Sequence, residues 1–222
     1  MELVNRKCGI TADLRRWLGI RFSIEGDLRF ISHHDTVRMF ERGLARAELP
    51  VKRSGGFNPR MQLSLPLPRS VGIAGLAELL IVEMTEPVEP DEALRRLSGE
   101  MPADVRLRSI EAYSDGGPRA ATSAKYAIDL PEAAAMSPRV EAFLARQQSE
   151  VERRDAKTGA VRRIDVRSFV SDVRLEDGRL EWTQTMRSGA TARPAEVLAA
   201  LGLDPQETLH RVTRVAVEFH RT

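Results

Sequence analysis

Residues 20–49 read IRFSIEGDLRFISHHDTVRMFERGLARAEL, and this stretch predicts a strand, a turn and a helix in that order. Its first residues alternate between apolar and polar, as in a strand with one buried face. A Gly-Asp turn follows, after which Ser32 or Asp35 can cap a helix that continues to about Leu49. Apolar residues recur along that helix at helical spacing, and Pro50 ends it.

The first half of the chain continues with further elements of both kinds. We expect strands at residues 61–67, 78–85 and 105–113 and a helix at residues 90–99. Prolines near the end of the first of these strands favour a place at a sheet edge. The resulting β-α-β-β-α-β order is typical of a ferredoxin-like unit. We therefore predict a ferredoxin-like domain at residues 19–113, preceded by an N-terminal extension at residues 1–18.

A small and polar segment, SDGGPRAAT at residues 114–122, predicts a linker that covers residues 114–123. The remaining residues, 124–222, form the second predicted unit. Its expected elements are strands at 125–130 and 211–219, helices at 137–147 and 194–201, and hairpins at 150–166 and 170–187. The predicted fold class is α+β, with two ferredoxin-like units in tandem and the second enlarged by an extra β-hairpin.

The charge of the chain is balanced in number but uneven in kind. Among 222 residues, 34 are basic and 32 acidic, yet only four of the basic residues are lysines. Arginine forms bidentate contacts with phosphate and carboxylate groups better than lysine does. Acidic residues are interspersed nearly everywhere, so we favour codon bias and a solvated charged surface as the explanation of this composition, with recognition of phosphate or carboxylate groups as the alternative.

Cys8 is the only cysteine, which excludes a disulfide within the chain and a metal or iron–sulfur site built from its own cysteines. We expect no cofactor and no metal site. No run of apolar residues approaches the length of a membrane span, and the N-terminus lacks the apolar core of a signal peptide. The sequence therefore predicts a cytoplasmic protein with no membrane contact.

The start of the first predicted helix carries the candidate catalytic residues His33 and Asp35. Backbone N–H groups at a helix start attract anions, and a histidine there can act as a general acid or base. Asp35 can orient His33, or it can simply cap the helix. Arg38, one turn further, can reach a ligand held at this place, whereas His34 is expected only to be exposed.

A glycine-rich loop, SGGFNPR at residues 54–60, supplies the second group of candidates. Its glycines permit positive φ angles, and its Asn-Pro pair fixes a turn. Phe57 is expected to plug the core, with an exposed stacking platform as the alternative. Arg53 and Arg60 flank the loop and can clamp an anion. The predicted ligand site thus contains Ser32, His33, Asp35, Arg38, Arg53, Ser54, Gly56, Phe57, Asn58 and Arg60.

The second half offers a charged row. Arg163, Asp165 and Arg167 occupy alternate positions of a predicted strand and would share one of its faces, and Arg193 precedes the next helix. These residues form a candidate partner surface, or alternatively an exposed face joined by salt bridges.

Several stretches together resemble a known family: RFISHHD at residues 29–35, FERGLARAELP at 40–50, SGGFNP at 54–59 and LSLPLP at 63–68. With RRIDVR, LEDGRL and ARPAEVL in the second half, the chain resembles the radical-SAM-linked protein family, a bacterial domain of unknown function. The resemblance implies a partner, a cobalamin-binding radical SAM enzyme, to which members are adjacent or fused. It implies no established activity. The matching positions are Phe30, Ser32, His33, Asp35, Ser54, Gly56, Phe57, Asn58 and Pro59.

The chain departs from the family pattern in two places. His34 stands where an apolar residue is common, and Arg60-Met61-Gln62 stands where many relatives have His-Pro-Arg. Three hypotheses follow. In the first, the chain is an accessory module that binds RNA or a ribonucleoprotein and presents it to a radical SAM enzyme. In the second, it is a metal-independent RNA-processing or RNA-modifying enzyme that uses His33. In the third, it is a protein–protein docking module for the radical SAM partner. The RNA hypotheses expect His33 and the loop at 54–60 to line one pocket.

Overall fold

The computed structural model describes residues 16–118, 120–130, 133–155, 158–187 and 190–220. The predicted extension at residues 1–18 lies almost wholly outside this part. The first half contains β1 (Trp17–Ile24), α1 (His33–Arg46), β2 (Leu63–Ser64), β3 (Ala74–Glu83), α2 (Pro90–Ser98) and β4 (Val105–Tyr113). The second half contains β5 (Ala121–Asp129), α3 (Ala133–Ala145), β6 (Glu150–Arg154), β7 (Val161–Asp165), β8 (Val170–Glu176), β9 (Arg179–Thr185), α4 (Pro194–Ala200), α5 (Pro205–Thr208) and β10 (Thr213–Phe219). The short 3₁₀ helices are η1 (Gly26–Phe30), η2 (Val166–Phe169) and η3 (Leu209–Arg211).

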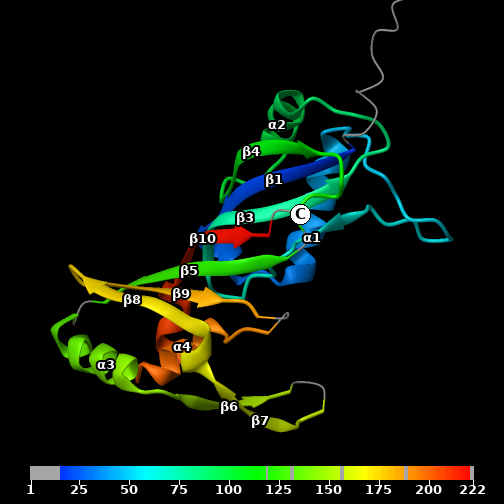
Figure 1. The fold of residues 1–222 in the computed structure, drawn as a ribbon. Helices are drawn as coiled ribbons and strands as arrows, with labels where there is room; N and C mark the ends of the chain where they lie inside the picture. The colour runs from blue at the N-terminus through cyan, green and yellow to red at the C-terminus, as the bar shows by residue number, and fades with distance from the viewer. Residues whose placement is uncertain (1–15, 119, 131–132, 156–157, 188–189, 221–222) are drawn as a thin grey trace, which may run out of the picture.

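One large and mostly antiparallel sheet runs through the described part of the chain in the order β4-β1-β3-β10-β5-β9-β8, and β2 pairs with β3 beside this path (Figure 1). The predicted α+β class is confirmed. The division into two tandem ferredoxin-like units, and the domain boundaries with it, stay predictions. Strands β6 and β7 form a separate two-stranded sheet.

The helices α1 and α2 bury their apolar faces against one face of β1, β3 and β4. Phe40 and Leu44 of α1 and Leu97 of α2 are fully buried there, together with Ile20 of β1. Phe22 and Phe40 meet edge to face with ring centroids 4.7 Å apart, which adds a specific contact to the area that they bury. This packing fixes the position of α1 on the sheet.

The last strand, β10, joins the two halves. It runs parallel to β3 and antiparallel to β5, so the C-terminal strand lies between strands of both halves. Arg214 of β10 donates a hydrogen bond from Nε to Glu78 of β3 at 2.9 Å and another from Nη2 to the carbonyl of Leu67 at 2.9 Å. The sequence predicted the strand but not its pairing with β3.

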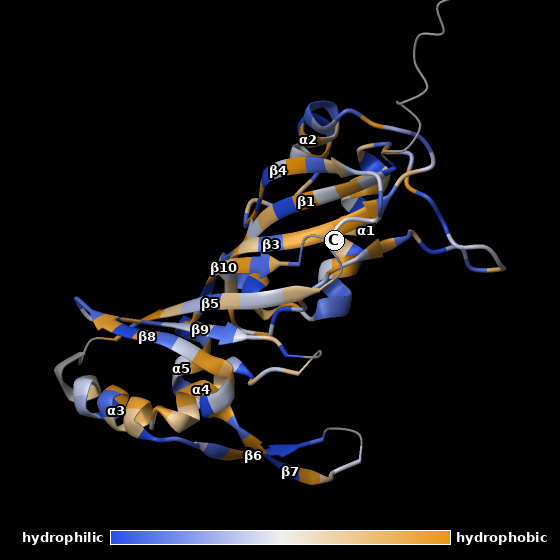
Figure 2. Ribbon diagram, in the orientation of Figure 1, coloured by the Kyte–Doolittle hydropathy of each residue, from blue (hydrophilic) through white to orange (hydrophobic). Residues whose placement is uncertain are grey.

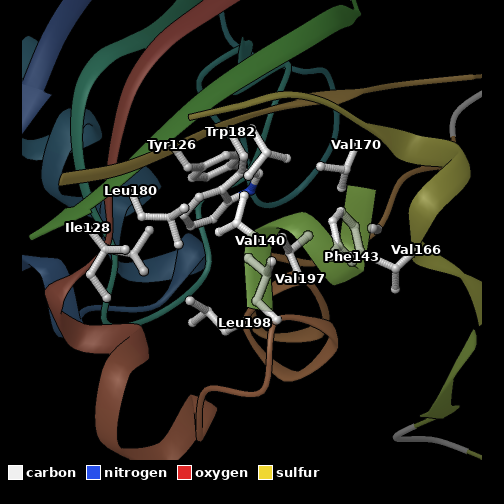
Figure 3. Close-up of a cluster of buried hydrophobic side chains, with 14 of the residues drawn as sticks. Tyr126, Ile128, Val140, Phe143, Val166, Val170, Leu180, Trp182, Val197 and Leu198 are labelled. Carbon is white, nitrogen blue, oxygen red and sulfur yellow. The ribbon is translucent and has the colours of Figure 1, made fainter. Parts of the chain in front are cut away.

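The second half has its own core, which Figure 3 shows. Tyr126 and Trp182 from neighbouring strands stack with ring centroids 5.5 Å apart. Phe143 of α3 and Val197 of α4 are fully buried against this part of the sheet. In Figure 2, α3 and α4 both carry hydrophobic residues, and Val140, Phe143, Val197 and Leu198 of these helices belong to the core.

Several element boundaries differ from the sequence predictions. The strand expected at residues 61–67 is only two residues long, because prolines remove ladder donors from its end. The helix expected at 137–147 begins earlier, at Ala133, with Pro138 inside it. The predicted linker contains buried residues at 116–118, among them Gly117, which has a φ of +64°. None of the helices within the described residues is long and apolar enough to cross a membrane.

Candidate functional site

The start of α1 is held by a reciprocal cap. The hydroxyl of Ser32 accepts a hydrogen bond from the backbone N–H of Asp35 at 3.1 Å and donates one to its carboxylate at 2.7 Å. The hydrogen bond from Ser32 lowers the pKa of Asp35, and the charge of Arg38 lowers it further. Arg38 lies 3.5 Å from the same carboxylate. Ser32 is therefore the N-cap residue of α1, and the carboxylate of Asp35 supports the cap by accepting from its hydroxyl.

His33 faces inward at the first turn of α1. Its Nδ1 is buried and has no hydrogen-bond partner within the described residues. The ring borders a small cavity of about 10 Å³ that Phe22, Leu65 and Leu67 also line. Loss of hydration lowers the pKa of His33, and the neighbouring His34 lowers it further. The imidazole is thus neutral near pH 7, and the cavity that it borders is lined by Thr36, Arg69 and Glu78 as well as by apolar groups.

A basic hollow, which we call the α1 hollow, lies on the exposed side of α1 and has a volume of about 450 Å³. It is lined by His34, Val37, Arg38, Glu41, Arg42, Ala45, Arg53, Pro59, Arg60 and Met61. His34, Arg38 and Arg42 are four residues apart, so they form one stripe along the helix. The lining contains four arginines and one histidine but only one carboxylate.

The loop at residues 54–60 forms the other wall of the α1 hollow. Its base is a hairpin in which Arg53 and Met61 form an isolated β-bridge. The hydroxyl of Ser54 accepts a hydrogen bond from the backbone N–H of Arg60 at 3.0 Å, and the backbone N–H of Ser54 donates one to the carbonyl of Arg60 at 2.8 Å. Figure 1 shows this cyan segment projecting beside α1, away from the large sheet. The hairpin holds both arginines close to the helix.

Phe57 lies at the tip of this loop and is fully exposed, with a relative accessible surface of 106%. The expectation that it plugs the core is wrong. Gly56 has a φ of +108°, and a Cβ atom at Gly55 or Gly56 would meet nothing within 4 Å. The chain reverses direction where no other segment can cover it, so the aromatic ring meets only solvent. The alternative position, an exposed platform, is the one observed.

The predicted pocket shared by His33 and the loop therefore differs from the observed one. Arg38, Arg53 and Arg60 of the predicted set line the α1 hollow, but His33 borders the inner cavity on the other side of the helix start. Adjacent helical residues are about 100° apart, so only one of the two histidines can face the loop. That residue is His34, which the sequence analysis expected only to be exposed.

The guanidinium groups of Arg42, Arg53 and Arg60 have no carboxylate partner within the described part of the chain. Their neighbour Lys52, by contrast, pairs with Glu83 at 2.5 Å. Uncompensated arginines around one concavity create a positive potential that favours an anionic ligand. Arg42 was missing from the predicted site, although its spacing of four residues from Arg38 was a visible signal.

The charged row predicted in the second half is not present as one strand face. Strand β7 ends at Asp165, and Arg167 belongs to η2. Asp165 caps η2 by accepting from the backbone N–H of Arg167 at 3.2 Å, while Arg163 lies 3.6 Å from Glu150. Arg193 donates its backbone N–H to Glu196 at the start of α4. Alternation failed as a guide because the chain leaves the strand at Asp165.

No group of three or more histidine, cysteine, aspartate or glutamate side chains that could hold a metal ion occurs among the described residues. The site is instead defined by arginines and one exposed aromatic ring. It belongs to an α+β protein with a positively charged hollow beside a projecting loop.

The chain belongs to a bacterial family described as "Uncharacterized protein conserved in bacteria (DUF2344)", which matches residues 18–194. This range includes α1, the loop at 54–60 and most of the second half. No curated protein matches the chain.

Proposed function

We propose that this protein is an accessory module that binds RNA through the α1 hollow and the loop at residues 54–60. One observation carries the proposal: a fully exposed Phe57 projects beside a hollow lined by four arginines. Positively charged grooves follow the nucleic-acid backbone, and exposed aromatic rings stack on unpaired bases. The arrangement favours single-stranded RNA, or a single-stranded segment of a ribonucleoprotein, in the cytoplasm.

In this proposal the arginines of the α1 hollow and the ring of Phe57 contact different parts of the RNA. Arg53 and Arg60 extend from a hairpin base that is hydrogen-bonded, so their backbone is ordered before a ligand arrives. Arg38 and Arg42 approach from the helix. Phosphate groups between the two walls would receive hydrogen bonds from both, while Phe57 stacks on a neighbouring base.

An RNA-processing or RNA-modifying enzyme that uses His33 receives less support. A general acid or base needs to reach the reacting group, and the Nδ1 atom of His33 is buried at an inner cavity that residues 53–61 do not line. Asp35 contributes its carboxylate to the cap with Ser32. Asp35 is thus engaged at the start of α1, and the ring of His33 borders the inner cavity instead of the loop at residues 54–60.

The partner in this proposal is a cobalamin-binding radical SAM enzyme, as the resemblance of the motifs implies. The RNA module would hold the substrate while the enzyme modifies it. A docking role without RNA is the second candidate, and the exposure of Phe57 favours it too, because an exposed aromatic ring can fill a pocket of a protein partner.

The experiment is a titration of the purified chain with a fluorescent oligouridine at several salt concentrations. The variant R53Q/R60Q should weaken binding and reduce the slope of log K against log salt by about 1.4 if two phosphate contacts are lost. R106Q/R108Q is the matched control, because both of its arginines are exposed on β4 and have no ion pair within the described residues. Absence of binding at low salt, or equal loss in both variants, would refute the RNA proposal.

A pull-down with the radical SAM enzyme separates the two candidates. Docking is supported if the chain does not bind oligouridine, if the capture persists after nuclease treatment, and if Phe57→Ala abolishes the capture. Capture that requires RNA supports the accessory module.

A further inference from the structure

A second basic hollow lies in the other half of the molecule, between the end of α3, η2 and the start of β8. It has a volume of about 520 Å³. Three arginines line it, Arg146, Arg167 and Arg187, together with the hydroxyl-bearing residues Ser168, Ser171 and Thr185. No carboxylate is part of its lining. We call it the η2 hollow.

The central arginine of the η2 hollow is fixed in position. The Nη1 atom of Arg167 donates to the carbonyl of Val170 at 3.0 Å, and its guanidinium carbon lies 5.7 Å from the ring centroid of Phe143. Figure 3 shows Phe143 beside Val166, which precedes this arginine in the chain, and Val170, whose carbonyl the arginine contacts. A guanidinium held by a hydrogen bond and a ring loses little conformational entropy when it binds a ligand.

The same guanidinium is left with unused donors. Its Nε is buried and has no acceptor within the described residues, which is a costly state for a charged N–H group. The side chains of Arg146 and Arg187 are exposed and form no ion pair in the described part of the chain. An anion in the hollow would give all three guanidiniums an acceptor and offset their mutual repulsion.

Another hollow, near the turn between β8 and β9, contains arginines that are paired with carboxylates of the protein itself. Arg174 and Arg179 line a hollow that contains four carboxylates. Arg179 lies 2.9 Å from Asp129 and 3.1 Å from Glu181. Charges there are compensated within the protein, whereas those of the η2 hollow are not. This contrast indicates that the η2 hollow receives its negative charge from a ligand.

We propose that the η2 hollow is a binding site for a phosphate group, separate from the α1 hollow. Three guanidiniums and the hydroxyl of Ser171 match the acceptors of a phosphate, which takes several hydrogen bonds at once. The phosphate is either part of an RNA backbone or carried by a small phosphorylated ligand. In both cases the chemistry of recognition is the same.

The first test is calorimetric titration with inorganic pyrophosphate at low salt. It uses the full chain carrying R53Q/R60Q, so that the α1 hollow, which keeps Arg38 and Arg42, contributes less and equally in every variant. Adding R146Q/R187Q should weaken pyrophosphate binding at least about tenfold, whereas adding R106Q/R108Q should leave it unchanged. All these arginines are exposed, and thermal unfolding should confirm that each variant is folded.

The second test identifies the source of the phosphate, with Arg53 and Arg60 intact. If an RNA backbone supplies it, R146Q/R187Q also weakens oligouridine binding and lowers the salt slope by about 1.4. If a small ligand supplies it, oligouridine binding does not change while pyrophosphate binding is lost. The proposal is overturned if pyrophosphate does not bind, or if R146Q/R187Q and R106Q/R108Q affect it equally.

Discussion

The buried pair of Arg214 and Glu78 should be the most sensitive electrostatic contact in the molecule. Their side chains are only 2% and 5% exposed, and they join β10 to β3, the strands where the two halves meet. Glu78→Gln keeps the size of the side chain but removes its charge, so Arg214 stays buried without a counter-ion. Arg69, whose pKa burial lowers, lies close enough to feel the same loss.

The expected cost follows from that burial. Breaking a buried ion pair by removing one partner destabilises a protein by about 3–5 kcal/mol, because the remaining charge is not solvated. For a chain of this size, the melting temperature should fall by roughly 6–20 °C. Urea unfolding of the full chain measures the free energy directly, with the slope m reporting whether the transition remains cooperative.

Two further variants make this experiment decisive. Glu92→Gln removes one partner of the exposed Arg95–Glu92 pair and should cost less than about 1 kcal/mol. Replacing both buried partners, as in E78L/R214M, should recover part of the loss because no isolated charge remains. If Glu78→Gln costs no more than Glu92→Gln, the argument that this pair holds β10 against β3 is refuted.

Three other outcomes are expected from single substitutions. Ser32→Ala removes the cap of α1 and should lower the free energy of unfolding by about 1 kcal/mol in the same urea assay; an unchanged value would show that the cap adds no stability. His33→Gln should reduce the loss of stability at acid pH. Burial lowers the pKa of His33 in the folded chain, so the unfolded chain takes up its proton first as the pH falls. The free energy of unfolding of the unmodified protein therefore falls as the pH drops through about 6.5 and below, and that of the variant falls less. An equal acid slope in both proteins would contradict this. Phe57→Ala should leave the melting temperature unchanged, because the ring is fully exposed, but weaken oligouridine binding by about 1–3 kcal/mol; a large loss of stability would mean that the ring packs against the protein.

Local patterns in the sequence predicted the elements better than their ends. The helix α1 was predictable because its cap and its apolar spacing act within a few residues, but it ends at Arg46, before the end at about Leu49 that Pro50 predicted. The strand at residues 61–67 was overestimated, since alternation of leucines says nothing about whether a partner strand lies along its whole length. The charged row of the second half failed for the same reason, because Asp165 turns the chain into η2.

The structure brings part of the candidate site together. Arg38, Arg53 and Arg60 line one hollow beside α1, since the hairpin returns the chain to the helix. His33 and His34 are adjacent, so spacing alone gave no reason to prefer either. The exposed position of Phe57 was predicted only as the alternative, because the average preference of phenylalanine for the interior is a poor guide at the tip of a loop with two glycines.

The sequence by itself determined the α+β class, the cap and face of α1, and the presence of a glycine-rich loop flanked by arginines, because short-range hydrogen bonding and periodicity encode these features. Only the tertiary structure decided that β10 lies between β3 and β5, that His34 rather than His33 faces the loop, and that arginines far apart in the chain meet around two hollows. Those arrangements depend on long-range packing of the sheet and on the burial of Arg214 against Glu78, and neither leaves a local pattern in the chain.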